Sequence, residues 1–116
     1  MQLLILILKK VELMDELLKQ LAAHDIKGGT IVDAHGMGAA LMSMEELPMF
    51  GSLRQLLGTA GKEEAKLLLM AIKDAQVIPA SKVIKDVIGD LSKPNTGVLI
   101  TLPIYYCEGL VDSDAE

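Results

Sequence analysis

Residues 3–8 read LLILIL, and this run of six aliphatic side chains decides the fold class. Successive side chains of a strand point to opposite faces of its sheet, so the run makes both faces apolar. Its length is typical of a buried strand and is far too short to cross a bilayer. Basic residues follow the run at Lys9 and Lys10 and none precedes it, which argues against a secretion signal.

Three further segments are predicted to be strands. Residues 66–72 (KLLLMAI) are apolar at successive positions, like the first run. Residues 30–34 (TIVDA) are rich in β-branched side chains, and residues 97–104 (GVLITLPI) form a fourth strand that is closed by Pro103. The chain therefore supplies four strands, two of them apolar on both faces.

Two segments have the spacing of amphipathic helices. Residues 12–24 (ELMDELLKQLAAH) carry leucines at helical intervals with charges between them, and the helix is expected to stop before the Gly28-Gly29 pair. Residues 80–91 (ASKVIKDVIGDL), which follow Pro79, place their aliphatic side chains on one stripe. The order of elements is then β-α-β-loop-β-α-β.

This order predicts a single α+β domain over residues 1–116, with the βαββαβ plan of a ferredoxin-like sandwich. Both helices cover one face of a four-stranded antiparallel sheet in that plan. The inner strands, residues 3–8 and 66–72, are also apolar on the other face, and the sequence has no third helix to cover it. We therefore expect the chain to associate with copies of itself through that face.

The composition indicates an apolar surface that a partner subunit covers, and it argues against nucleic acid as a ligand. Hydrophobic residues make up 51% of the chain, whereas aromatic residues make up 3% and the net charge is -5. A chain with scattered basic residues and few aromatics is unsuited to binding nucleic acid. Cys107 is the single cysteine, which indicates a reducing compartment and predicts a cytoplasmic protein.

A long loop is predicted between the second and third strands. Residues 37–65 show no steady period, and a loop of this length in a small domain is usually functional. A short helical turn is expected around residues 53–57. The segment holds four of the seven methionines, Met37, Met42, Met44 and Met49. These side chains fit an adaptable apolar docking surface better than a Cu(I) site, because leucines share the segment. Residues 105–116 form a C-terminal tail.

The motifs of common catalytic and cofactor sites are missing. Gly36-Met37-Gly38 lacks the third glycine of a dinucleotide fingerprint and the Gly-Lys-Ser/Thr of a P-loop. His24, His35 and Cys107 show no zinc-binding spacing. Cys107 has no base close to it in the sequence, and the adjacent carboxylates of residues 45–46 lie in the loop. The sequence therefore predicts a protein that is not an enzyme.

Several stretches, taken together, resemble the P-II family of nitrogen-regulatory signalling proteins. These are the opening strand LLILILKK, the helix VELMDELLKQLAAHDI, the segment IKGGTIVDAHGMG and the last strand NTGVLITLPI. In the family, a Gly-x-Thr strand likewise runs into Gly-x-Gly, and a glycine-bearing turn precedes the last strand. The match covers most of residues 3–104 in order and spacing.

The resemblance implies a homotrimer whose sheets face inward and whose clefts between subunits bind an adenine nucleotide (AMP, ADP or ATP). It implies that the long loop docks onto a target protein, such as a membrane transporter or a metabolic enzyme. Carried over by position, the ligand-binding residues are those at the base of the loop, on the neighbouring strands and on the opposing turn: Ile7, Thr30, Gly36, Met37, Gly38, Gly97 and Val98.

The chain also departs from the family pattern at positions that bind phosphate. The family turn usually reads Gly-Asp-Gly-Lys, whereas residues 95–98 read Asn-Thr-Gly-Val, and the C-terminal arginines have no counterpart after Ile104. Each missing charge-assisted hydrogen bond is worth about 1.5–3 kcal/mol. A less charged ligand than ATP, such as a nucleoside monophosphate or another small effector, is easier to accommodate.

These observations predict a cytoplasmic P-II-like regulatory protein with a small effector and a protein target. One alternative is a metal-binding trimer like the cation-tolerance proteins, which would need His35, Met37 or Cys107 to gather around an ion. The other is a small enzyme, for which the sequence offers no acid-base pair.

Overall fold

The computed structural model describes residues 1–42 and 64–110 and shows an α+β arrangement of one sheet and two long helices. The strands are β1 (Gln2–Leu8), β2 (Gly29–His35), β3 (Glu64–Ile72) and β4 (Gly97–Pro103). The helices are α1 (Met14–Ala23), α2 (Met37–Met42) and α4 (Val77–Ile88), and short 3-10 turns precede two of them, η1 (Val11–Leu13) and η3 (Asp74–Gln76).

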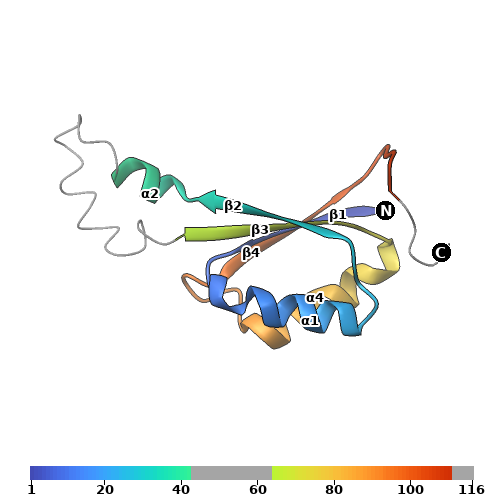
Figure 1. Cartoon of the computed structure of the whole chain (residues 1–116), viewed down its shortest axis with the longest axis horizontal. Coiled ribbons are helices and arrows are strands. Elements are labelled where there is room, and N and C mark those ends of the chain that lie inside the picture. The colour runs from blue at the N-terminus through green and yellow to red at the C-terminus, as the bar shows by residue number, and fades with distance from the viewer. Residues whose placement is uncertain (43–63, 111–116) are drawn as a thin grey trace.

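The four strands form one antiparallel sheet in the order β2-β3-β1-β4. β3 lies between β1 and β2, so the crossover through α1 joins two parallel strands that are not neighbours. Helices α1 and α4 lie side by side on one side of the sheet (Figure 1). The prediction of an antiparallel four-stranded sheet with two helices is confirmed, and the topology is compatible with a ferredoxin-like fold.

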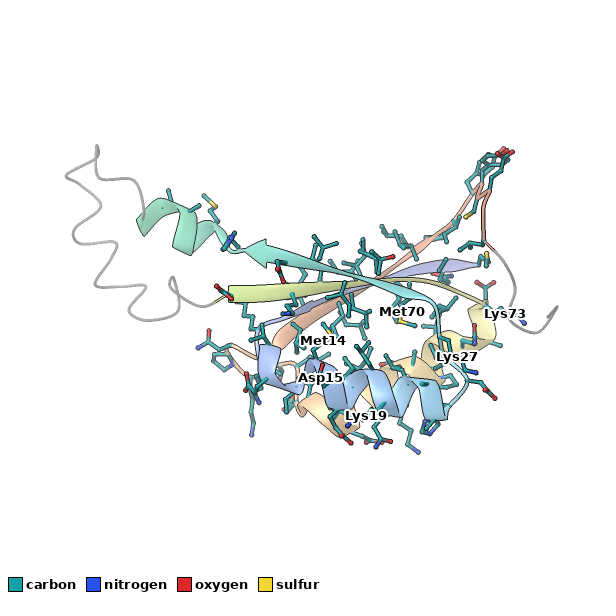
Figure 2. All side chains as sticks on the ribbon, in the orientation of Figure 1. Met14, Asp15, Lys19, Lys27, Met70 and Lys73 are labelled. Atoms are coloured by element: carbon teal, nitrogen blue, oxygen red, sulfur yellow. The ribbon has the colours of Figure 1, made fainter. Side chains whose placement is uncertain are left out.

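The core lies between the sheet and these two helices. Alternate residues of the inner strands supply it, and they are 0–3% exposed: Leu4, Leu6, Leu8, Leu68, Met70 and Ile72. Met14, Leu17 and Leu21 of α1 and Val83, Ile84 and Ile88 of α4 pack against them. Figure 2 shows Met14 and Met70 between the layers and Lys19 on the outer side of α1, as the helical spacing predicts.

The second long helix begins earlier than the sequence predicted. Residues 80–91 were expected to be helical, whereas α4 runs from Val77 to Ile88. Pro79 lies in the first turn of the helix rather than before it, where backbone N–H groups have no acceptor within the helix and a proline therefore removes no hydrogen bond. The helix ends at Gly89, whose φ of 99° is in the left-handed region that favours glycine.

The prediction of an irregular loop over residues 37–65 is wrong at both ends. Residues Met37–Met42 form α2, and β3 begins at Glu64, two residues before the predicted start. The sequence did not predict α2, because Gly38, Ala39 and Ala40 give no apolar period. The helical turn expected at residues 53–57 and the carboxylates at 45–46 lie outside the described residues.

Candidate functional site

The sheet face turned away from α1 and α4 carries rows of aliphatic side chains from all four strands. The register places Val32, Leu67, Ile7 and Val98 in one row. Thr30, Leu69, Ile5 and Ile100 make the next row, and Ala71, Leu3 and Leu102 make the one beyond it. We call these three rows the open face. Thr30 is its one polar residue, and no charged side chain belongs to it.

No helix of the described residues lies over the open face (Figure 1). Its residues on the inner strands are half-buried by their neighbours alone. Its aliphatic residues on the edge strands are exposed, from 38% for Ile100 to 46% for Leu102. Contiguous apolar patches of this kind usually mark a site of interaction. The chemistry of the open face suits another apolar surface and offers nothing to a charged ligand.

Three of the predicted ligand-binding residues come together on β1 and β4. Ile7 lies opposite Val98 on the open face, and Gly97 lies one position before it, opposite Leu8. A Cβ atom at Gly97 would be 2.8 Å from the carbonyl oxygen of Ile7, which is closer than such atoms approach. Glycine is therefore required here by the close approach of two strands, independently of any ligand.

Thr30 shares the open face with Ile7 but does not contact it. Its partner in β3 is Leu69, which in turn lies opposite Ile5 of β1. Two strand spacings therefore separate Thr30 from β1, about 10 Å across the sheet. In a single chain, Thr30 and Ile7 line the same surface without forming one pocket.

The glycine motif lies at the far end of β2, away from β4. Gly36 follows the last residue of the strand, and its carbonyl oxygen accepts a hydrogen bond from the Ala40 N–H at 3.1 Å. Three strand spacings separate the β2 edge from Gly97, about 14 Å. One chain therefore does not bring Gly36, Met37 and Gly38 to Gly97. A site that contains both groups requires two copies.

The base of the glycine motif has room around it. A Cβ atom added at Gly36 would meet no heavy atom within 4 Å, and its φ is not positive. Met37 is exposed. The motif therefore presents backbone and a flexible thioether to solvent, and the fold itself does not require glycine at position 36.

An ion pair that the sequence did not reveal lies on the helix side of the β2–β3 ribbon. Asp33 Oδ1 is 3.5 Å from Lys66 Nζ, and the next cross-strand pair on the same face is His35 opposite Glu64. Only the strand register brings these charges together, so residue spacing could not have found them. Both members of the ion pair are partly exposed, and such pairs are worth about 0–1 kcal/mol.

The residues proposed for a metal site do not gather in one place, because His35 and Met37 lie at the end of β2 whereas Cys107 follows β4 at the opposite edge of the sheet. His24 ends α1, where its Nδ1–H donates to the Gln20 carbonyl oxygen at 2.8 Å, whereas His35 ends β2 and Cys107 follows β4. Within residues 1–42 and 64–110, no three His, Cys, Asp or Glu side chains lie close enough together to hold a metal ion.

A second exposed feature, for which the sequence predicted no role, follows β4. Tyr105 and Tyr106 are exposed, and the Tyr106 hydroxyl donates a hydrogen bond to the Glu108 carboxylate. This bond raises the pKa of Tyr106, because ionised tyrosine could not donate it. The adjacent tyrosines were visible in the sequence, but only the structure shows that no part of the described chain covers them.

No protein-family model matches the chain, and none of the curated proteins matches it significantly. In the ranges 1–42 and 64–110, no helix is both long and apolar enough to span a membrane.

Proposed function

We propose that the chain is a P-II-like regulatory protein. In this proposal, it forms a homotrimer, binds a small effector in clefts between subunits and passes the signal to a target protein through the segment between β2 and β3. The effector is an adenine nucleotide or a related metabolite. The observation that carries the proposal is the open face, whose side chains are aliphatic except for Thr30 and over which no helix of residues 1–42 and 64–110 lies.

The open face supports assembly from identical subunits. Burying apolar surface is worth about 25 cal/mol per Å², and the face has no charge whose desolvation would oppose burial. A closed ring of three sheets covers each open face with the same chemistry that it presents. The ring also places an edge strand of one copy beside an edge strand of the next.

The positions of the glycine motif and of Gly97 support a ligand site between copies. They lie at opposite edges of one sheet, so the two groups meet only across a boundary between two chains. On one side of such a cleft, the backbone around Gly36 is accessible because nothing lies within 4 Å of a Cβ placed there. On the other side are Ile7 and Val98, which favour an uncharged ring over a polyphosphate.

The β2–β3 ribbon supports the docking role. Figure 1 shows α2 at the end of β2, beyond the part of the sheet that α1 and α4 cover. Segments held out from a rigid body in this way are well placed to meet a second protein. The proposed target is a membrane transporter or a metabolic enzyme, and the protein itself catalyses no reaction.

A thermal-shift panel tests the ligand part of the proposal. The ligands are AMP, ADP, ATP, cyclic nucleotides and 2-oxoglutarate, each with and without Mg²⁺. A ligand at a hundredfold excess over its Kd stabilises the native state by about 2.7 kcal/mol. We expect a selective shift, with AMP favoured over ATP because the phosphate-binding lysine and arginines are missing.

The variant Gly36→Val makes the test specific. The added side chain has space in the isolated chain, so we expect the fold to be kept and the shift to be lost. Ala22→Val, on the exposed side of α1, is the matched enlargement away from the cleft and should keep the shift. A flat panel, or a shift that survives Gly36→Val, would refute the proposed site.

A further inference from the structure

The segment after β4 projects on the same side of the sheet as the open face. The Ile104 N–H donates to the Met1 carbonyl oxygen at 3.0 Å, which is its last hydrogen bond to the sheet. Beyond it, residues 105–110, which we call the tyrosine segment, form a projection away from the side that α1 and α4 occupy and then turn back (red in Figure 1). The segment therefore stands at one end of the open face, next to Leu102.

The apolar side chains of the tyrosine segment are barely covered by the rest of the described chain. Tyr105 is 104% exposed and Tyr106 is 72% exposed, and Leu110 is also exposed. Aromatic side chains bury about 150–250 Å² each when they are covered, and they dominate the energetics of many interfaces. These are the only two tyrosines in the chain, and both stand in solvent where the chain folds alone.

A second copy that covers the whole open face also contacts the tyrosine segment at its end. Both lie on one side of the sheet, so a surface that approaches the rows of the open face also meets residues 105–110 (Figure 1). The copy brings an aliphatic, uncharged surface, which suits the ring of Tyr105. It does not have to supply a partner for the Tyr106 hydroxyl, because Glu108 of the same segment already accepts its hydrogen bond.

We propose that the tyrosine segment of each copy packs on the open face of the neighbouring copy, at the row that contains Leu3 and Leu102. The subunits thereby exchange their C-terminal segments, with Tyr105 as the anchor. This inference rests on the assembly stated under "Proposed function" and adds which residues outside the sheet hold it together. The partner is a second copy of this chain.

The absence of tryptophan makes the proposal measurable with the chain's own fluorescence. The chain has no tryptophan and two tyrosines, so excitation at wavelengths that phenylalanine does not absorb gives emission from Tyr105 and Tyr106 alone, and Tyr106→Phe leaves Tyr105 as the single reporter. Acrylamide quenching of the Tyr106→Phe protein is measured over a dilution series, with the mass followed by light scattering. We expect several-fold weaker quenching in the assembled protein than after dilution to the monomer.

A pair of serine variants tests the energetic part. Tyr105→Ser is expected to weaken assembly about tenfold, as the loss of an interface anchor does. Ile78→Ser is the matched control, because Ile78 is 77% exposed but lies on α4 in the helix layer. It should leave assembly unchanged.

Three other outcomes would contradict the proposal, and each identifies a different error. If the protein assembles but Tyr105 stays as open to acrylamide as in the monomer, the exchange of segments is wrong and the assembly itself stands. Equal weakening by Tyr105→Ser and Ile78→Ser also refutes the anchor role. A wild-type chain that remains monomeric throughout refutes both this inference and the assembly beneath it.

Discussion

The two faces of the sheet are built from the same residue types in the same strands, yet they differ in what covers them. Leu68 and Leu69 are neighbours in β3, and Leu68 is fully buried beneath the helices while Leu69 is half-buried on the open face. Within the described part of the chain, identical chemistry is thus packed against helices on one side and has no helix over it on the other. In the ranges 1–42 and 64–110, helices therefore complete the apolar packing on one face of the sheet only.

The largest effect is expected from placing a charge in the middle row of the open face. Ile100 lies opposite Ile5, and an aspartate there would become an unpaired buried charge on assembly. Such a charge costs about 3–5 kcal/mol. We expect Ile100→Asp to keep its circular dichroism spectrum and to sediment as a monomer.

Thr101→Asp is the control for this change. Thr101 is the next residue of β4, points to the other side of the sheet and is exposed there. It should assemble like the wild type. If both variants assemble normally, the open face is not the interface.

The next effect separates the two leucines of β3. Leu68→Ala removes a fully buried side chain and should lower the free energy of unfolding by about 2–5 kcal/mol. Leu69→Ala should cost less when urea unfolding is measured at the lowest protein concentration, where subunits separate. Equal losses for the two variants in the dilute protein would show that the open face is already covered within one chain.

A smaller effect is expected where β1 and β4 approach each other closely. A Cβ at Gly97 would be 2.8 Å from the Ile7 carbonyl oxygen, so Gly97→Ala forces the strands apart. Overpacking of this kind costs about 1–3 kcal/mol. Gly36→Ala, where a Cβ has open space, should leave thermal unfolding nearly unchanged. The reverse ranking of the two variants would contradict the strand register on this side of the open face.

The smallest effect concerns a turn that belongs to neither face. The Ser92 hydroxyl and backbone N–H donate hydrogen bonds to Asp90, and they lower its pKa below the ordinary 3.8. The ionised form is favoured by folding, so the stabilisation is present above the unfolded pKa and is lost as pH falls through the folded pKa. Urea midpoints measured below pH 3.8 should fall less steeply in Asp90→Asn. An identical slope in both proteins would assign the acid sensitivity to other groups, and assembly should not respond to the substitution.

The strand runs predicted the sheet because aliphatic side chains at successive positions leave few alternatives. Residues 3–8 and 66–72 could hardly be anything but inner strands, and the structure extends them only to Gln2 and to Glu64. Helix boundaries were harder to predict. Pro79 looked like a boundary but is tolerated in a first turn, and α2 has too little apolar period to be recognised.

Only separate residues of the candidate site could be predicted from the sequence, and not their arrangement. The sequence pointed to Gly97, and the structure supplies a physical reason for that glycine in the Ile7 carbonyl oxygen. The relation of Gly36 to Gly97 could not be derived, because the two lie at opposite edges of one sheet and residue spacing carries no information about neighbouring chains. The exposure of Tyr105 could not be predicted either, because it depends on where the folded chain places the segment after β4.

Sedimentation equilibrium of the wild-type protein at micromolar concentration tests the central claim most directly. A mass of three times the 12.5 kDa chain is the predicted result, because three inward-facing sheets cover every open face. A single mass of 12.5 kDa would contradict the account, since the open face would then be a stable surface of a monomer.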